Sequence, residues 1–291
     1  MEDYVMINMP EKFRNDEEIK QYNPWKEVAL KYVDNERCLY DDNNKYYYPE
    51  DEQAIDDFNN KWGDGTDRII TSIPAEPWWG NPLKAKLIIL SLNPGYVPEI
   101  NMTLAKLLQY TSSVRKSLID YKKLTLVLKA DSLIPPKGQM EPISCREAVN
   151  MLGDWYWYKK LTTLQNDVNM DEDEFYKNVA IIEYHGYSSQ TSDHNFPIGN
   201  KYLETQIFIK KMIWYLAENK KDVRFLIVRS EKKWISLLCD GYADFYEKYK
   251  NKFKCKGHKG MSQSITAKNL GEKIYGELKE LFENNVKKPL K

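Results

Sequence analysis

Three nearly continuous apolar runs constrain the fold more than any other feature of this sequence. They are LIILSL (Leu87–Leu92), VAIIEY (Val179–Tyr184) and VRFLIVR (Val223–Arg229), and all are rich in branched side chains. Such runs are typical of strands buried on both faces, as in a parallel sheet covered by helices. A fourth segment, YKNKFKCK (Tyr249–Lys256), alternates between apolar and basic residues, which predicts an edge strand with one solvated face.

Helical periodicity surrounds these strands. Residues 200–221 and 269–285 each place apolar side chains along one helical stripe. We therefore predict an α/β fold with three α/β/α layers around a central, mainly parallel four-stranded sheet. Residues 1–75 are expected to form a helical or irregular N-terminal extension. Residues 76–291 are expected to form the α/β domain, with a helical insertion at about 97–178.

Composition and charge restrict the classes of partner. The 43 basic and 43 acidic residues balance, so a nucleic acid would have to be held by a local patch. The four cysteines form no CxxC pair, and the cysteines and three histidines show no ligand spacing, so we expect no metal and no cofactor. No signal peptide or membrane-spanning run is apparent. We expect a cytoplasmic monomer with reduced thiols that does not associate with a membrane.

Polar side chains follow each predicted strand. In open parallel sheets, ligands bind beyond the carboxyl ends of the strands, so these residues are candidates for a shared site. Turn preference explains Asn, Gly and Ser at such places without any function, but it does not explain Glu, His or Arg. The candidates are Asn93, Glu183, His185, Ser188, Arg229, His258 and Asn269.

The sequence Asn93-Pro94-Gly95 ends the first apolar run. Pro94 removes a backbone donor, so an internal strand cannot continue through it. Gly95 allows a positive φ and the close approach of a ligand to the backbone. Asn93 then presents an amide that both donates and accepts hydrogen bonds, and that can orient a water molecule or a base edge.

The run SLNPGY, preceded by PWWGNP, resembles the first signature of the uracil-DNA glycosylase superfamily. It is most similar to the branch that includes the thymine/uracil mismatch glycosylases, whose motif carries Asn rather than Asp. The resemblance extends over roughly residues 75–285, through the order of four strands, polar loops at their carboxyl ends and a Ser-containing loop before the last helix.

The resemblance implies roles for individual residues. Asn93 would position the attacking water, and Glu183 or His185 would act at the base, with Glu183 accepting from the base edge or replacing a water-activating carboxylate. His185, Arg229 or His258 would stabilise the departing base. The residues expected to line the base pocket are Pro94, Gly95, Tyr96, Tyr184, Ser188 and Arg229. The residues expected to contact nucleic acid are His258, Lys259, Ser262, Ser264 and Asn269, together with Lys254 and Lys256.

Those last two lysines belong to a basic stretch. From Lys248 to Lys259 the chain carries six lysines and no acidic residue. Phosphate contacts require such a concentration of charge. Lysines also protect edge strands from pairing with other chains, and the sequence does not decide between these two interpretations.

Three functions remain open. The first is hydrolysis of the N-glycosidic bond of a damaged or modified base in DNA, single- or double-stranded. The second is nucleic-acid or nucleotide binding without catalysis on the same fold, which the absence of a carboxylate in the first motif favours. The third is hydrolysis of free nucleosides or nucleotides, which the balanced charge suits.

Overall fold

The three apolar runs form neighbouring parallel strands at the centre of one sheet. In this computed structural model they are β2 (Leu87–Leu90), β3 (Val179–Ile182) and β4 (Arg224–Ile227), and β2 lies between the other two. Leu87 is in register with Val179 on one side and with Arg224 on the other. The structure describes residues 9–30, 45–62, 67–72, 75–92, 120, 123–130, 156–189, 194–199, 202–256 and 264–283.

The sheet has five strands, so the predicted number of four is wrong. The additional strand is β1 (Trp78–Trp79), which pairs antiparallel with β3 and gives the order β1-β3-β2-β4-β5. Pro and Gly residues surround Trp78 and Trp79 in the sequence, a composition that is typical of loops. Two residues are too few to show the alternation that identifies a strand. Only their pairing with β3 defines them as a strand.

The edge strand β5 (Phe253–Cys255) pairs parallel with β4, but it is shorter than predicted. The expected strand began at Tyr249, whereas α11 (Phe245–Tyr249) and the 3₁₀ turn η2 (Lys250–Lys252) occupy its first half. In the helix, Phe245 and Tyr249 lie one turn apart with ring centroids separated by 5.0 Å. Apolar residues four positions apart lie on the same side of a helix and also on the same side of a strand. The spacing alone therefore does not distinguish the two structures.

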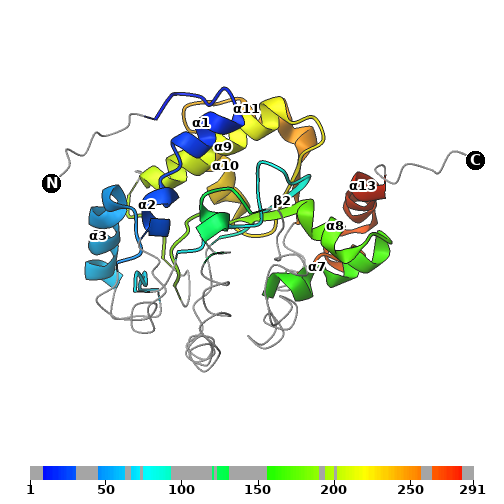
Figure 1. Ribbon diagram of the computed structural model, residues 1–291, viewed down its shortest axis with the longest axis horizontal. Helices are drawn as coiled ribbons and strands as arrows, with labels where there is room; N and C mark the ends of the chain where they lie inside the picture. The colour runs from blue at the N-terminus through cyan, green and yellow to red at the C-terminus, as the bar shows by residue number, and fades with distance from the viewer. Residues whose placement is uncertain are drawn as a thin grey trace, which may run out of the picture.

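Helices cover both faces of the sheet (Figure 1). On one face, Ile88 and Leu90 pack with α9 (Glu204–Asn219) and α10 (Glu231–Cys239) in what we call the first core. On the other face, Leu87 and Ile89 belong to the second core. The helices of the second core are α7 (Tyr156–Asp167), α8 (Glu172–Lys177), α12 (Ala267–Leu270) and α13 (Glu272–Glu283).

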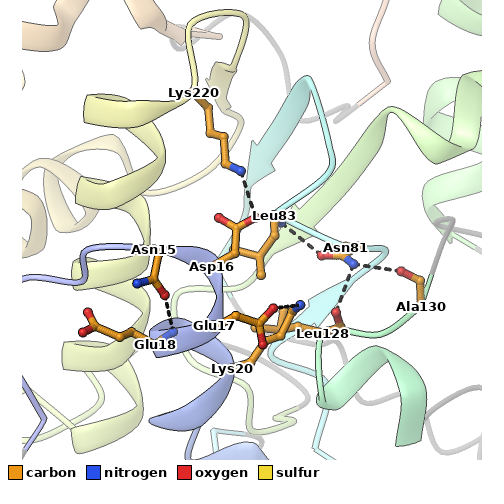
Figure 2. Close-up of polar contacts among 10 residues, drawn as sticks. All are labelled: Asn15, Asp16, Glu17, Glu18, Lys20, Asn81, Leu83, Leu128, Ala130 and Lys220. Carbon is orange, nitrogen blue, oxygen red and sulfur yellow. Dashed lines mark hydrogen bonds and ion pairs between the residues drawn. The ribbon is translucent and has the colours of Figure 1, made fainter.

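The N-terminal segments add a further set of buried side chains to the first core. Phe13 packs edge-on against Phe208 of α9, with 5.6 Å between ring centroids. Asn15 caps the first helix by accepting from the Glu18 backbone N at 2.9 Å, and Lys220 at the end of α9 pairs with Asp16 at 2.9 Å (Figure 2). The N-terminal elements are α1 (Asp16–Gln21), α2 (Trp25–Leu30), η1 (Pro49–Asp51) and α3 (Glu52–Trp62).

Two residues fix the chain on either side of β1 and β3. Buried Asn81 donates from Nδ2 to the carbonyls of Leu128 (3.0 Å) and Ala130 (2.9 Å), which holds the segment 123–130 in place (Figure 2). After β3, Gly186 lies directly under the indole of Trp25. A Cβ at residue 186 would approach that ring to 2.7 Å, so only glycine fits while Trp25 occupies this position.

Candidate functional site

In open parallel sheets, ligands bind beyond the carboxyl ends of the strands. β4 leads directly to α10 on the first core, and Leu92, which follows β2, belongs to the first core as well. The hydrogen bonds between neighbouring strands continue beyond the carboxyl ends of β2, β3 and β4. Ser91 N donates to Ile182 O at 2.9 Å, and Val228 N donates to Leu90 O at 3.0 Å. The carboxyl ends of β2, β3 and β4 therefore form one rigid edge.

Glu183 is the central side chain of this edge. It follows Val179 and Ile181 with strand alternation, which directs it to the face of the second core, and it is 3% exposed. Its Oε2 has no hydrogen-bond partner among the described residues. Burial raises the pKa of Glu183 to about 8, with the charge of Glu76 acting in the same direction. The carboxyl is consequently protonated at neutral pH and can donate a hydrogen bond.

Ser91, Trp157 and Arg229 surround this carboxyl. Hydrogen bonds from the side chains of Ser91 and Trp157, and the charge of Arg229, oppose the rise in the pKa of Glu183 without cancelling it. Trp234 of α10 secures the end of β2 by donating from Nε1 to Ser91 O at 2.7 Å. The structure thus brings together Glu183 and Arg229, as the sequence predicted, and adds Ser91 and Trp157.

His185 lies near this edge but is not a cation. Its ring is 4% exposed and packs edge-on against Phe196 at 5.0 Å, and its Nδ1 has no partner among the described residues. Burial, followed by the charge of Lys233, lowers the pKa of His185 to about 3. A neutral imidazole cannot stabilise a departing base by its charge, which is the role predicted for His185.

Two other predicted base-pocket residues have contacts elsewhere. Tyr184 is a buried member of the first core and packs edge-on against Trp234 at 5.3 Å. Ser188 is also buried, and its carbonyl accepts from Ile70 N at 2.8 Å in an isolated bridge. Neither is placed with Glu183.

The predicted nucleic-acid residues divide into two groups. Lys254 forms an ion pair with Glu277 of α13 at 2.5 Å. Asn269 donates from Nδ2 to Ser264 O at 2.9 Å, so these two residues close the turn into α12. Lys256 differs because it is only 7% exposed and lies at the carboxyl edge of the sheet, where its backbone N donates to Ile227 O at 3.0 Å.

Several predicted site residues cannot be placed. They lie outside the described residues, so the structure neither places them near Glu183 nor separates them from it. These residues are Asn93, Pro94, Gly95, Tyr96, His258, Lys259 and Ser262.

A histidine–carboxylate pair near His185 was not anticipated. His194 Nδ1 and its backbone N both lie 2.6 Å from Oδ2 of Asp67, and the ring stacks on Trp62 at 3.7 Å. The charge of Asp67 and the ring of His185 are both near Lys233 of α10. The two paired residues are 127 positions apart, so no local spacing signals their contact.

Tyr156 and Trp157 of α7 are two further residues near Glu183 that no sequence motif indicated. Trp157 is buried in the second core, but Tyr156 is 46% exposed. The charges of Arg229 and Glu183 both act on the Tyr156 hydroxyl, whose pKa burial raises. The first turn of α7 therefore lies near Glu183 and Arg229.

Neither a metal cluster nor a membrane-spanning helix occurs in the part of the chain that the structure describes. Within it, no group of three or more His, Cys, Asp or Glu side chains is arranged to hold a metal ion. No helix in the described ranges has the length and apolar character needed to cross a membrane. Comparison with protein-family models, curated proteins and solved structures finds no match to this chain.

Proposed function

We propose that the carboxyl edge of the sheet around Glu183 binds a nucleobase and that the chain hydrolyses the N-glycosidic bond of a damaged or modified base in DNA. The observation that carries the proposal is the buried Glu183 carboxyl, whose Oε2 lacks a partner among the described residues. A buried polar atom without a partner is costly, and a base edge that hydrogen bonds to it removes that cost. The resemblance to uracil-DNA glycosylases supports the same substrate class.

In the proposed chemistry, each transferred proton has a named donor and a named acceptor. Water attacks C1′ of the sugar, the C1′–N bond breaks, and its electron pair moves to the base. Arg229 stabilises the negative charge that develops on the base, and protonated Glu183 then donates a proton to it. The proton released by the water returns to Glu183, so the products are the sugar hydroxyl and the free base. Asn93 is proposed to position the water.

A second candidate is recognition of the base without cleavage. It is favoured by the protonation states of Glu183 and His185. The first is protonated at neutral pH and the second is buried among aromatic side chains, so neither is suited to take a proton from water as the first step. A protonated carboxyl still recognises a base edge, because it offers both a donor and an acceptor.

The experiment measures base release and binding on labelled single- and double-stranded DNA that carries uracil, hypoxanthine or mismatched thymine. Glu183→Gln keeps a donor and an acceptor but cannot transfer a proton. We expect it to slow release by about 100-fold or more, with binding nearly unchanged. Glu247→Gln is the matched control, since that carboxylate is exposed and pairs with Lys250 at 2.9 Å.

The outcomes separate the two candidates. Equal release by Glu183→Gln and Glu247→Gln would remove Glu183 from catalysis and contradict the proposed mechanism. Binding that depends on Glu183, without release from any substrate, would establish recognition in its place. If no oligonucleotide binds, both candidates fail for DNA.

A further inference from the structure

A small pocket lies between the chain around β1 and the segment 123–130. The volume that it offers to water is about 10 Å³, which is room for one water molecule. Four apolar and two polar residues line it, namely Ala75, Trp78, Trp79, Leu126, Glu76 and Thr125. The pocket therefore suits a single water molecule that the two polar side chains hold.

Thr125 supplies a buried hydroxyl to this pocket. The residue is 4% exposed, and its Oγ1 has no hydrogen-bond partner among the described residues. Its carbonyl accepts from Trp78 Nε1 at 2.7 Å and from Leu128 N at 3.0 Å, which fixes its main chain beside β1. A buried hydroxyl without a partner costs free energy, and a water molecule in the pocket removes that cost.

Glu76 places the pocket at the same edge of the sheet as Glu183. Because β1 runs antiparallel to β3, the residues that precede β1 lie beside the carboxyl end of β3. Glu76 N donates to Gly186 O at 2.8 Å, and the next carbonyl, that of Pro77, accepts from Glu183 N at 2.9 Å. Glu76 is partly exposed, and its two carboxylate oxygens can accept from a water molecule alongside its other contacts.

We propose that this pocket holds the water molecule that attacks the sugar, bound between the Thr125 hydroxyl and the Glu76 carboxylate, and that Glu76 is the general base. The proposal rests on the N-glycosidic hydrolysis proposed above. That reaction needs a group that takes a proton from water, a task for which Glu183 and His185 are not suited. Glu76 supplies this group at the edge where the base is proposed to bind.

The protons balance with two carboxyls in the reaction. The water oxygen bonds to C1′ as the C1′–N bond breaks, and the electron pair of that bond moves to the base. Glu76 takes the proton of the water, and Glu183 gives its own proton to the base. A proton then passes through solvent from Glu76 to Glu183, which restores both groups. Asn93 keeps the role proposed for it, as a further contact of the same water.

The first test locates the water directly. We expect a high-resolution crystal structure of the full chain to show an ordered water within hydrogen-bond distance of both Thr125 Oγ1 and the Glu76 carboxylate. In a crystal structure of Thr125→Val, which removes the hydroxyl but keeps the shape of the side chain, this water should be lost. A dry pocket in the wild type would overturn the proposal.

The second test measures base release by the same chains on the oligonucleotides described above. Glu76→Gln should slow release by about 100-fold or more, and Thr125→Val by about tenfold, with DNA binding nearly unchanged. Thr125→Ser, which keeps a hydroxyl, should release base faster than Thr125→Val. The matched controls are Glu247→Gln and Thr163→Val, both at exposed positions, and each should retain the wild-type rate.

Two readouts separate a general base from a residue that only supports the fold. Release by the wild type should fall at acidic pH as the base becomes protonated, and Glu76→Gln should lose this acidic limb. Added formate should restore part of the activity of Glu76→Ala, because it supplies a carboxylate to the emptied position. A slow Glu76→Gln that keeps the acidic limb, together with a Glu76→Ala that formate does not restore, would overturn the role of Glu76.

The outcomes also distinguish this proposal from the proposed function. If Glu183→Gln slows base release but Glu76→Gln matches the wild type, the proposed function stands and Glu76 is not the base. If the wild type releases no base from any oligonucleotide, the proposed hydrolysis fails and the role of Glu76 as its general base fails with it. An ordered water on Thr125 and Glu76 would then still establish the water site.

Discussion

Asp51 and Glu183 are both buried carboxyls, but their surroundings differ. Asp51 accepts from the Tyr187 hydroxyl (2.7 Å), the Thr205 hydroxyl (2.6 Å) and the Glu204 backbone N (2.9 Å), so both its oxygens have partners. Burial raises the pKa of Asp51 to about 6, and these hydrogen bonds limit the rise. Glu183 keeps one oxygen without a partner among the described residues, and its pKa reaches about 8. The first carboxyl joins η1 to α9, whereas the second remains available to a ligand.

Removing the Asp51 carboxyl should produce the largest effect on stability. Asp51→Ala leaves three donors without their acceptor, two at the start of α9 (Glu204 N and the Thr205 hydroxyl) and the Tyr187 hydroxyl, and we expect the free energy of unfolding to fall by about 4 kcal/mol. Urea denaturation measures this change. Asp56→Ala, an exposed acid on α3, is the control and should change stability by less than about 0.5 kcal/mol. Similar losses in the two variants would show that Asp51 does not join these segments.

Glu183 should instead make the folded chain less stable as the pH rises. Its folded pKa is about 8, above the ordinary 4.5, so the folded state retains a proton that the unfolded state releases. Below pH 4.5 both states are protonated and the contribution vanishes. As the pH rises from 4.5 to 8, the wild type should lose stability relative to Glu183→Gln, by about 1.4 kcal/mol per pH unit at most.

Thermal or urea denaturation of both chains between pH 4.5 and 8.5 measures this difference. Taking the difference between the chains removes the parallel contribution of Asp51, which both retain. If the difference in the free energy of unfolding between the two chains is constant across this pH range, Glu183 is ionised in the folded state. The contrast drawn between Glu183 and Asp51 would then no longer hold.

The smallest expected change concerns Ser91. Its hydroxyl contributes the largest of the interactions that hold down the pKa of Glu183, so Ser91→Ala should raise that pKa further. We expect stability at pH 7 to fall by about 1 kcal/mol. Carbon-13 NMR of the labelled carboxyl follows the titration directly, with Ser236→Ala as a control whose hydroxyl contacts Tyr202 at 3.0 Å. An unchanged titration midpoint in Ser91→Ala would show that the Ser91 hydroxyl does not interact with the Glu183 carboxyl.

The central strands could be predicted from sequence because both faces of each are buried, which leaves a continuous apolar run. β1 could not, because Trp78 and Trp79 form a strand only through pairing with β3. Glu183 was identifiable because it follows directly on such a run. Ser91, Tyr156 and the pair of His194 with Asp67 were not, since their roles depend on contacts between segments distant in the sequence.

The contact between Gly186 and Trp25 also restricts how this sequence can change over time. The indole of α2 occupies the space that any side chain at residue 186 would need, and Pro77 Cβ lies 2.8 Å from the same position. A substitution at residue 186 should be acceptable only in a chain that has already exchanged Trp25 for a smaller residue and in which the backbone at Pro77 has moved away. In an alignment of homologues, these two positions should therefore covary, with glycine kept wherever the large aromatic ring is kept.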